Sequence, residues 1–127
     1  HITTATRETA MARFKALKAG ENFHDLDPEL KTTYSNADRT QNTIYMRLKY
    51  NEPSGTVVNV RKSMWIHPEL DRAISIREAA RLQTFPDSFI FEGTKDSQYQ
   101  QVGNAVPPYL AKAIADSVIS ILNNVAE

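Results

Sequence analysis

Cysteine is absent from the 127-residue sequence. Without thiols, the chain has no disulfide, no thiolate metal site and no cysteine nucleophile of its own. Glycine is also scarce, and the four glycines are isolated from one another, so no phosphate-binding loop is present. The three histidines, His1, His24 and His67, lack the spacing of paired metal ligands, and we therefore expect no metal site.

An excess of either charge is missing as well, because fifteen Lys and Arg residues balance fifteen Asp and Glu residues. The basic character of an independent nucleic-acid binder is therefore not found over the whole chain. No run approaches the ~18 apolar residues of a membrane-spanning helix, and no N-terminal leader is apparent. With 41% hydrophobic and 24% charged residues, the chain is too apolar to be disordered. His1 in place of Met suggests a fragment or a processed chain.

The N-terminal segment has the apolar period of a helix. Over residues 3–19, Met11, Phe14 and Leu17 recur every three residues among polar positions, and Gly20 suits the left-handed residue that ends a helix. This spacing predicts a helix whose apolar face is buried.

The middle of the chain changes from polar to β-prone. Residues 20–43 are polar, and we expect a functional or disordered loop there with one helical turn near residues 28–31. Residues 43–66 contain three short runs rich in β-branched and aromatic residues, which predict two or three short strands. We expect Trp65 to lie in the core.

Two further helices are predicted downstream. Residues 75–84 begin with a capping box, in which Ser75 and Glu78 satisfy each other's backbone amides. Residues 107–123 begin with two prolines and carry a wide apolar stripe, which must pack on something substantial.

Two segments are far more specific than these patterns. Residues 72–87 read RAISIREAARLQTFPD, and residues 101–108 read QVGNAVPP. In order, spacing and helix context, they resemble the last two sequence blocks of the DNA (cytosine-5) methyltransferases. Upstream, residues 47–57 read RLKYNEPSGTV, which is similar to the target-recognition region of that family.

The resemblance implies an α+β fold in two parts. Residues 1–88 would form a small target-recognition domain with short strands and helices. Residues 89–127 would form a connector and a C-terminal helix that packs on a Rossmann-like catalytic domain. The family's glycine-rich loop, Pro-Cys segment and Glu-Asn-Val segment do not occur in this sequence. In the family, a thiolate adds to carbon 6 of cytosine and so activates carbon 5 toward the methyl group of S-adenosylmethionine. We therefore expect this chain to be inactive alone.

The same resemblance implies roles for individual residues. The cofactor-binding candidates lie in the expected loop before the last helix, where Asn104 would offer its amide to the cofactor and Gly103 would take an unusual φ. These candidates are Gly103, Asn104, Ala105 and Val106. Alternatively, Asn104 only orders a tight turn.

The DNA-binding candidates lie within residues 39–62, which carry a local excess of four positive charges. We expect an arginine to read guanine and a neighbouring basic pair to bind phosphates. The candidates are Arg47, Thr56, Val57, Arg61 and Lys62. Each could instead be a solvated strand residue.

The block at residues 72–87 mainly supports the base of the recognition domain in the family, although its arginines could instead contact phosphates directly. The structural-support candidates are Arg72, Ser75, Arg77, Glu78, Arg81, Gln83 and Pro86.

Three hypotheses follow. The chain is the recognition and C-terminal part of a cytosine-5 DNA methyltransferase, a separate subunit of a split methyltransferase, or a DNA-binding module without catalytic function. The first two require double-stranded DNA, S-adenosylmethionine and a catalytic domain on the same or a partner chain, in the cytoplasm and away from membranes. Alone, the chain would expose the apolar stripe at residues 107–123, or bury it by dimerising or swapping.

Overall fold

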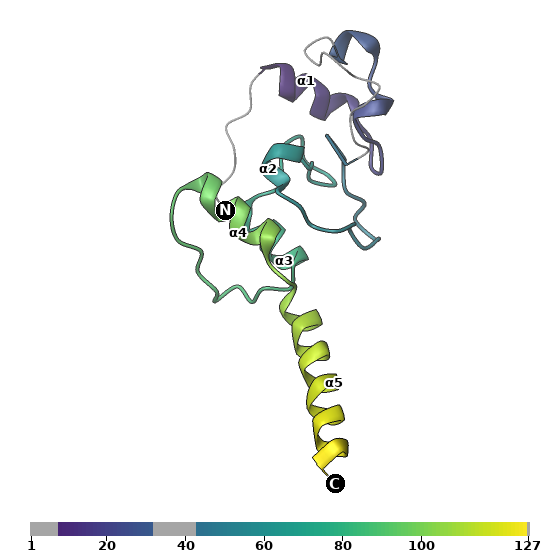
Figure 1. Ribbon diagram of the computed structural model, residues 1–127. Coiled ribbons are helices and arrows are strands. Elements are labelled where there is room, and N and C mark those ends of the chain that lie inside the picture. Colours follow the sequence, from purple (N-terminus) through teal and green to yellow (C-terminus); the bar gives the residue numbers. More distant parts are fainter. Residues whose placement is uncertain (1–7, 32–42, 127) are drawn as a thin grey trace.

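A computed structural model describes residues 8–31 and 43–126. Helical elements follow one another along the chain (Figure 1). They are the α-helix α1 (Glu8–Ala16), the 3₁₀ helices η1 (Phe23–Asp25) and η2 (Pro28–Lys31), and the α-helices α2 (Val60–Ser63), α3 (Ile76–Leu82), α4 (Lys95–Asn104) and α5 (Pro108–Ala126).

An N-terminal core forms around α1. Phe14 and Leu17 are buried there against Phe23 and Tyr45, which confirms the predicted apolar face, whereas Met11 is only partly buried. The described helix ends at Ala16, and the predicted residues 3–7 lie outside the described part of the chain. The helical turn predicted near residues 28–31 is confirmed as η2. This core packs α1 against residues that follow position 43, including Tyr45, Ile66 and Ala73.

The two or three short strands predicted over residues 43–66 are not formed in this described range, so this prediction of secondary structure was wrong. Two isolated bridges occur instead, Arg47 with Ile66 and Ile66 with Ala73. Tyr45 (φ 50°) and Met64 (φ 53°) adopt left-handed backbone conformations, Tyr45 in a turn and Met64 at the C-cap of α2, and these conformations interrupt the extended backbone that a strand needs. The α+β class of the complete fold remains a prediction.

The second core lies between α3 and α4. Trp65 is fully buried, as predicted, together with Val60, Ile74, Tyr99 and Val102. The predicted capping box is confirmed, because Ser75 accepts a hydrogen bond from the Glu78 amide and Glu78 accepts one from the Ser75 amide.

The helix α4 lies in the part of residues 89–127 for which the sequence predicted only a connector. It begins at the N-cap Thr94, whose side chain accepts a hydrogen bond from the Ser97 amide. Only Tyr99 and Val102 are buried from it, and both face the second core. A polar helix with two apolar anchors gives little periodic signal.

The helix α5 projects away from the rest of the chain (Figure 1). Its apolar stripe is exposed, as predicted for the chain alone: Leu110, Ile114, Val118 and Ile121 are 49–62% exposed. The stretch Lys95–Val125, which includes α5, is long and apolar enough to cross a membrane by length and composition alone. A single such helix is a weak indication, since helices that pack on another protein have the same property. The predicted dimer or swap through this helix stays a prediction.

Candidate functional site

A partly buried ion pair between Arg72 and Glu78 lies beside the start of α3 and supports the candidate site. Arg72 donates to Glu78 through both terminal nitrogens, at 2.8 and 2.7 Å. The carboxylate also accepts from the Ser75 amide at 2.7 Å. The hydrogen bonds from Arg72, above all, lower the pKa of Glu78 to about 2. Glu78 is therefore a fixed anion that ties α3 to the preceding segment and is unsuited to proton transfer near neutral pH.

The remaining arginines of this block bind the chain itself. Arg77 donates to the Phe89 carbonyl at 2.8 Å and, at 3.4 Å, to that of Pro86. Arg81 pairs with Asp87 through two hydrogen bonds of 2.9 and 2.8 Å, and this pairing lowers the pKa of the Asp87 carboxyl. These contacts shape the loop that leaves α3, and the structural-support role of the two arginines stays a prediction.

The two sequence blocks meet at Gln83. Its side-chain amide is buried and donates to the carbonyls of Val102 and Ala105, both at 3.0 Å. The next residue, Thr84, accepts a hydrogen bond from the Tyr109 amide at 3.2 Å. No sequence pattern pointed to Thr84, since its left-handed φ of 68° is unusual for a β-branched residue.

The four cofactor-binding candidates lie at the junction of α4 and α5. Gly103 and Asn104 are the last two residues of α4 and Ala105 is its C-cap, so the expected loop is shorter than predicted. Gly103 does not adopt a positive φ, which corrects the predicted reason for a glycine there. A Cβ at this position would lie 2.8 Å from the Val58 carbonyl carbon and 2.9 Å from the Asn59 amide nitrogen. Close backbone approach is therefore the reason for glycine.

Arg47, our first candidate for reading a base, is buried. Its guanidinium donates to the carbonyls of Phe14, Leu17, His67 and Leu70 and pairs with Asp71 at 2.7 Å. Only 5% of the residue is exposed. Arg47 thus joins the N-terminal core to the loop at residues 67–71, and the predicted base contact is wrong for this arrangement because its donors are already used.

The other DNA-binding candidates differ in their accessibility. Thr56 and Lys62 are exposed and remain candidates. Val57 is buried in the second core, which corrects its assignment as a contact residue. Arg61 is partly exposed and forms an ion pair with Asp96 of α4. A phosphate would have to compete with that carboxylate.

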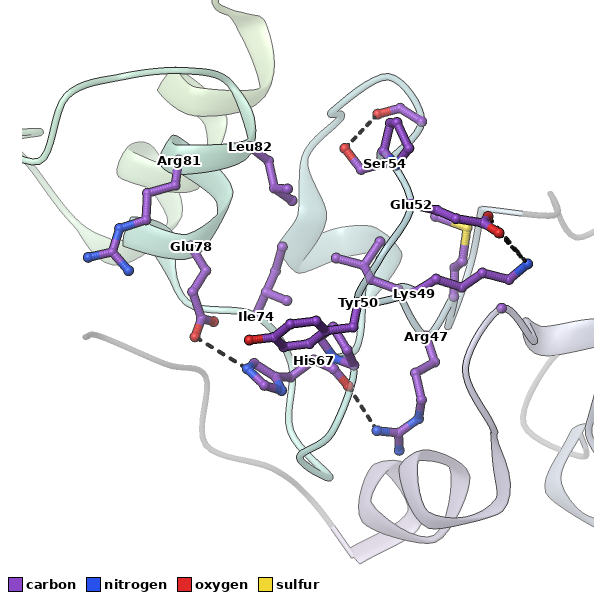
Figure 2. A pocket seen from close by; sticks show the side chains of 16 residues that line it. Arg47, Lys49, Tyr50, Glu52, Ser54, His67, Ile74, Glu78, Arg81 and Leu82 are labelled. Atoms are coloured by element: carbon purple, nitrogen blue, oxygen red, sulfur yellow. Dashed lines mark hydrogen bonds and ion pairs between the residues drawn. The ribbon is translucent and has the colours of Figure 1, made fainter.

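A hollow of about 620 Å³ lies between α3 and the loop at residues 49–55. Figure 2 shows Tyr50 at its centre, with His67 and Glu78 on one side and Lys49 and Glu52 on the other. Lys49 and Glu52 pair with each other, and the Nε2 atom of His67 lies 3.9 Å from the Glu78 carboxylate. Charges around the hollow are therefore largely paired within the chain.

A smaller hollow of about 420 Å³ brings the two groups of candidates together. It is lined by Thr56 and Val57 from the DNA-binding candidates and by Gly103 and Ala105 from the cofactor-binding candidates, with Gln83 between them. Regions that the sequence separates by about fifty residues thus share one surface. The sequence did not predict that DNA-binding and cofactor-binding candidates would line the same hollow.

The residues present are suited to one wall of a cofactor pocket. Asn104 is exposed at the end of α4, and its side-chain amide forms no hydrogen bond with the described residues. A carboxamide can both donate to and accept from an amino acid group. No cluster of potential metal ligands occurs among the described residues, and the sequence has no cysteine.

Comparison with known proteins gives a consistent result. The family model of the C-5 cytosine-specific DNA methylases matches residues 3–120. The Type II methyltransferase M.AgeI of Thalassovita gelatinovora is 38% identical over 118 residues, covering 91% of this chain and 26% of the relative. M1.HphI of Haemophilus parahaemolyticus is 37% identical, covering 90% of this chain and 29% of the relative. The chain therefore spans between a quarter and a third of these two proteins.

A shorter relative also matches. The Type II methyltransferase M.AquIB of Picosynechococcus sp. is 36% identical over 138 residues, which cover all of this chain and 91% of that relative. A family model over most of the chain, together with relatives of this identity, places the protein in a known group. The chain belongs to the C-5 cytosine-specific DNA methylase family.

Proposed function

We propose that this chain is the DNA-recognition and C-terminal part of a DNA (cytosine-5) methyltransferase. It would act in the cytoplasm on double-stranded DNA, together with a catalytic domain that carries the nucleophilic cysteine. The observation that carries the proposal is the shared surface of the 420 Å³ hollow, which is lined by Thr56 together with Gly103 and Ala105. Such a surface can join a DNA contact to a cofactor contact.

Each group of residues would have its own role in the reaction. Bound S-adenosylmethionine would supply the methyl group. Asn104 would hold the cofactor's amino acid end, while the backbone at Ala105 and Val106 would form the adjoining wall. Thr56 and Lys62 would contact the DNA, with Lys62 binding phosphate regardless of sequence. The carboxylate of Glu78, held by Arg72, would keep α3 in place next to the DNA-contacting and cofactor-contacting residues.

The exposed stripe of α5 supports a domain partner. An apolar face from Leu110 to Ile121 on an isolated helix is unusual for a monomeric protein and marks an interaction surface. We propose that the catalytic domain covers it, which would also complete the cofactor pocket. Base flipping requires a cleft between two domains, and this chain would supply one wall of that cleft.

Methyl transfer tests this proposal. Tritium transfer from labelled S-adenosylmethionine to duplex DNA should be undetectable with this chain alone and measurable when the cysteine-bearing catalytic portion is added. Retention of DNA binding without methyl transfer in the complete assembly would favour the non-catalytic DNA-binding module.

A separate subunit is the second candidate, and the similarity to M.AquIB favours it, since this chain covers 91% of that relative. The gene distinguishes the two. A continuous reading frame upstream of the His1 codon with a Pro-Cys segment would support a part of one enzyme. A start codon there, with the cysteine encoded by a neighbouring gene, would support a subunit.

A further inference from the structure

Two adjacent residues at the end of α3 contact both sides of the turn between α4 and α5. We propose that Gln83 and Thr84 are positioning residues that clamp this turn and so fix Asn104 for the cofactor. The inference rests on the proposed function. In this proposal the block at residues 72–87 does more than support the recognition domain. It also holds the turn formed by the block at residues 101–108.

Gln83 holds the α4 side of the turn. Its two carboxamide hydrogens are directed at the carbonyls of Val102 and Ala105, each 3.0 Å from Nε2. The Ala105 amide in turn donates to the Val102 carbonyl at 3.3 Å. Because Gln83 is only 5% exposed, water cannot easily replace it, and loss of the amide would remove a hydrogen bond from each of the two carbonyls.

Thr84 holds the α5 side. The first amides of a helix have no partner within the helix, and the Thr84 hydroxyl accepts from one of them, that of Tyr109, at 3.2 Å. Thr84 makes this contact with a φ of 68°, the left-handed conformation in which the chain leaves α3, where the Phe85 amide donates to the Ala80 carbonyl; this conformation is costly for a β-branched residue. Such strain persists only where the surrounding structure imposes it.

A third contact closes the clamp. Gly103 lies directly against the backbone of Val58 and Asn59, which adds a contact from a third segment of the chain. Asn104 lies between these contacts, yet it is exposed and its amide is unused within the described residues. The residues around Asn104 are therefore held while Asn104 itself is left available, which is the arrangement expected of a preorganised ligand contact.

The clamp can first be tested in this chain without any cofactor. Gln83→Leu removes both hydrogen bonds at similar volume. Tyr99→Phe is the matched control, because it removes one buried hydrogen bond, to the Ile74 carbonyl at 3.0 Å, from the same core. We expect amide hydrogen exchange at Ala105 and Tyr109 to accelerate at least about tenfold more in Gln83→Leu than in Tyr99→Phe. Equal exchange in the two variants would overturn the clamp.

Kinetics of the assembly with the catalytic portion provide the second readout. Gln83→Leu should raise KM for S-adenosylmethionine about tenfold, with kcat at saturating cofactor and KM for DNA changed less than about twofold. Tyr99→Phe should change none of these. A rise in both KM values together, or in neither, would show that Gln83 is only structural.

Thr84 offers a conservative pair of variants. Thr84→Ser retains the hydroxyl and should keep the wild-type KM for the cofactor, whereas Thr84→Ala should raise it and speed exchange at Tyr109. Equal behaviour of the two variants would remove Thr84 from the clamp. If the wild-type assembly transfers no methyl group, the proposed function fails and the cofactor role of the clamp fails with it. If only the variant effects are missing, the clamp fails and the proposed function stands.

Discussion

Gly103 of α4 lies against Val58, so closely that a Cβ atom on residue 103 would be 2.8 Å from the Val58 carbonyl carbon. Alanine is a better helix former than glycine by ~1 kcal/mol, so helix propensity alone predicts that Gly103→Ala stabilises the protein. The contact predicts the reverse, because the atoms in the way belong to the backbone. We expect a loss of about 1–3 kcal/mol in the free energy of unfolding, measured in urea.

Gly55→Ala is the control for this substitution, since no atom lies within 4 Å of a Cβ built there. It should leave stability nearly unchanged. A stabilised Gly103→Ala variant would contradict the close approach and, with it, the shared surface between α4 and the loop that contains Thr56.

The pH dependence of stability should reveal the Arg72–Glu78 pair. The pKa of Glu78 is lowered from an ordinary value of 4.5 to about 2 in the folded chain. The pair therefore stabilises the protein fully above the unfolded pKa, and its contribution is lost as pH falls from about 5 to about 2. Hydrogen bonds to a charged group of this kind contribute ~1.5–3 kcal/mol.

Glu78→Gln should flatten this part of the profile. Urea unfolding at several pH values should show the wild-type protein losing its advantage over Glu78→Gln between about pH 5 and pH 2. Asp87→Asn, which alters the exposed partner of Arg81, should have a smaller effect. A difference between wild type and Glu78→Gln that stays constant with pH would be inconsistent with the lowered pKa.

Arg47 should matter for folding and not for reading a base. Arg47→Lys keeps the charge, but an ammonium with three donors cannot replace a guanidinium that contacts four carbonyls and Asp71. We expect a destabilisation of about 3 kcal/mol or more by thermal unfolding. Lys49→Ala, at an exposed ion pair with Glu52, should cost less than about 1 kcal/mol. If Arg47→Lys leaves the melting temperature unchanged but weakens DNA binding, the buried role is refuted.

Lys62 should contribute a sequence-neutral phosphate contact. Lys62→Ala should weaken binding of the chain to duplex DNA and lower the magnitude of the slope of log K against log salt by about 1. Fluorescence anisotropy at several salt concentrations measures both. Lys112→Ala is the control, because Lys112 is exposed on α5 and pairs there with Asp116. Identical slopes for wild type and Lys62→Ala would exclude this contact.

Local signals in the sequence predicted those parts of the fold that local interactions determine. The capping box at Ser75 and Glu78, the turn at η2 and the apolar stripe of α5 depend on residues a few positions apart. The helix α4 was missed, because its two buried residues are too few to establish a period. Its N-cap Thr94 was the available signal.

Contacts between residues that are far apart in the sequence were harder to predict. The burial of Arg47 depends on carbonyls that lie 20 to 33 residues away in the chain, and no local pattern reports them. The predicted strands failed for a related reason, since pairing depends on neighbours that the β-prone runs cannot specify. The sequence blocks located the candidate site, whereas its hydrogen-bonded turn required the structure.

The most direct test of the central claim is methyl transfer by the assembled enzyme. Purified chain and the cysteine-bearing catalytic portion, encoded upstream or in a neighbouring gene, would be mixed with duplex DNA and tritiated S-adenosylmethionine. We predict that neither component labels DNA alone and that the mixture labels carbon 5 of cytosine at a defined sequence. Efficient, sequence-specific methylation by the catalytic portion without this chain would contradict the account.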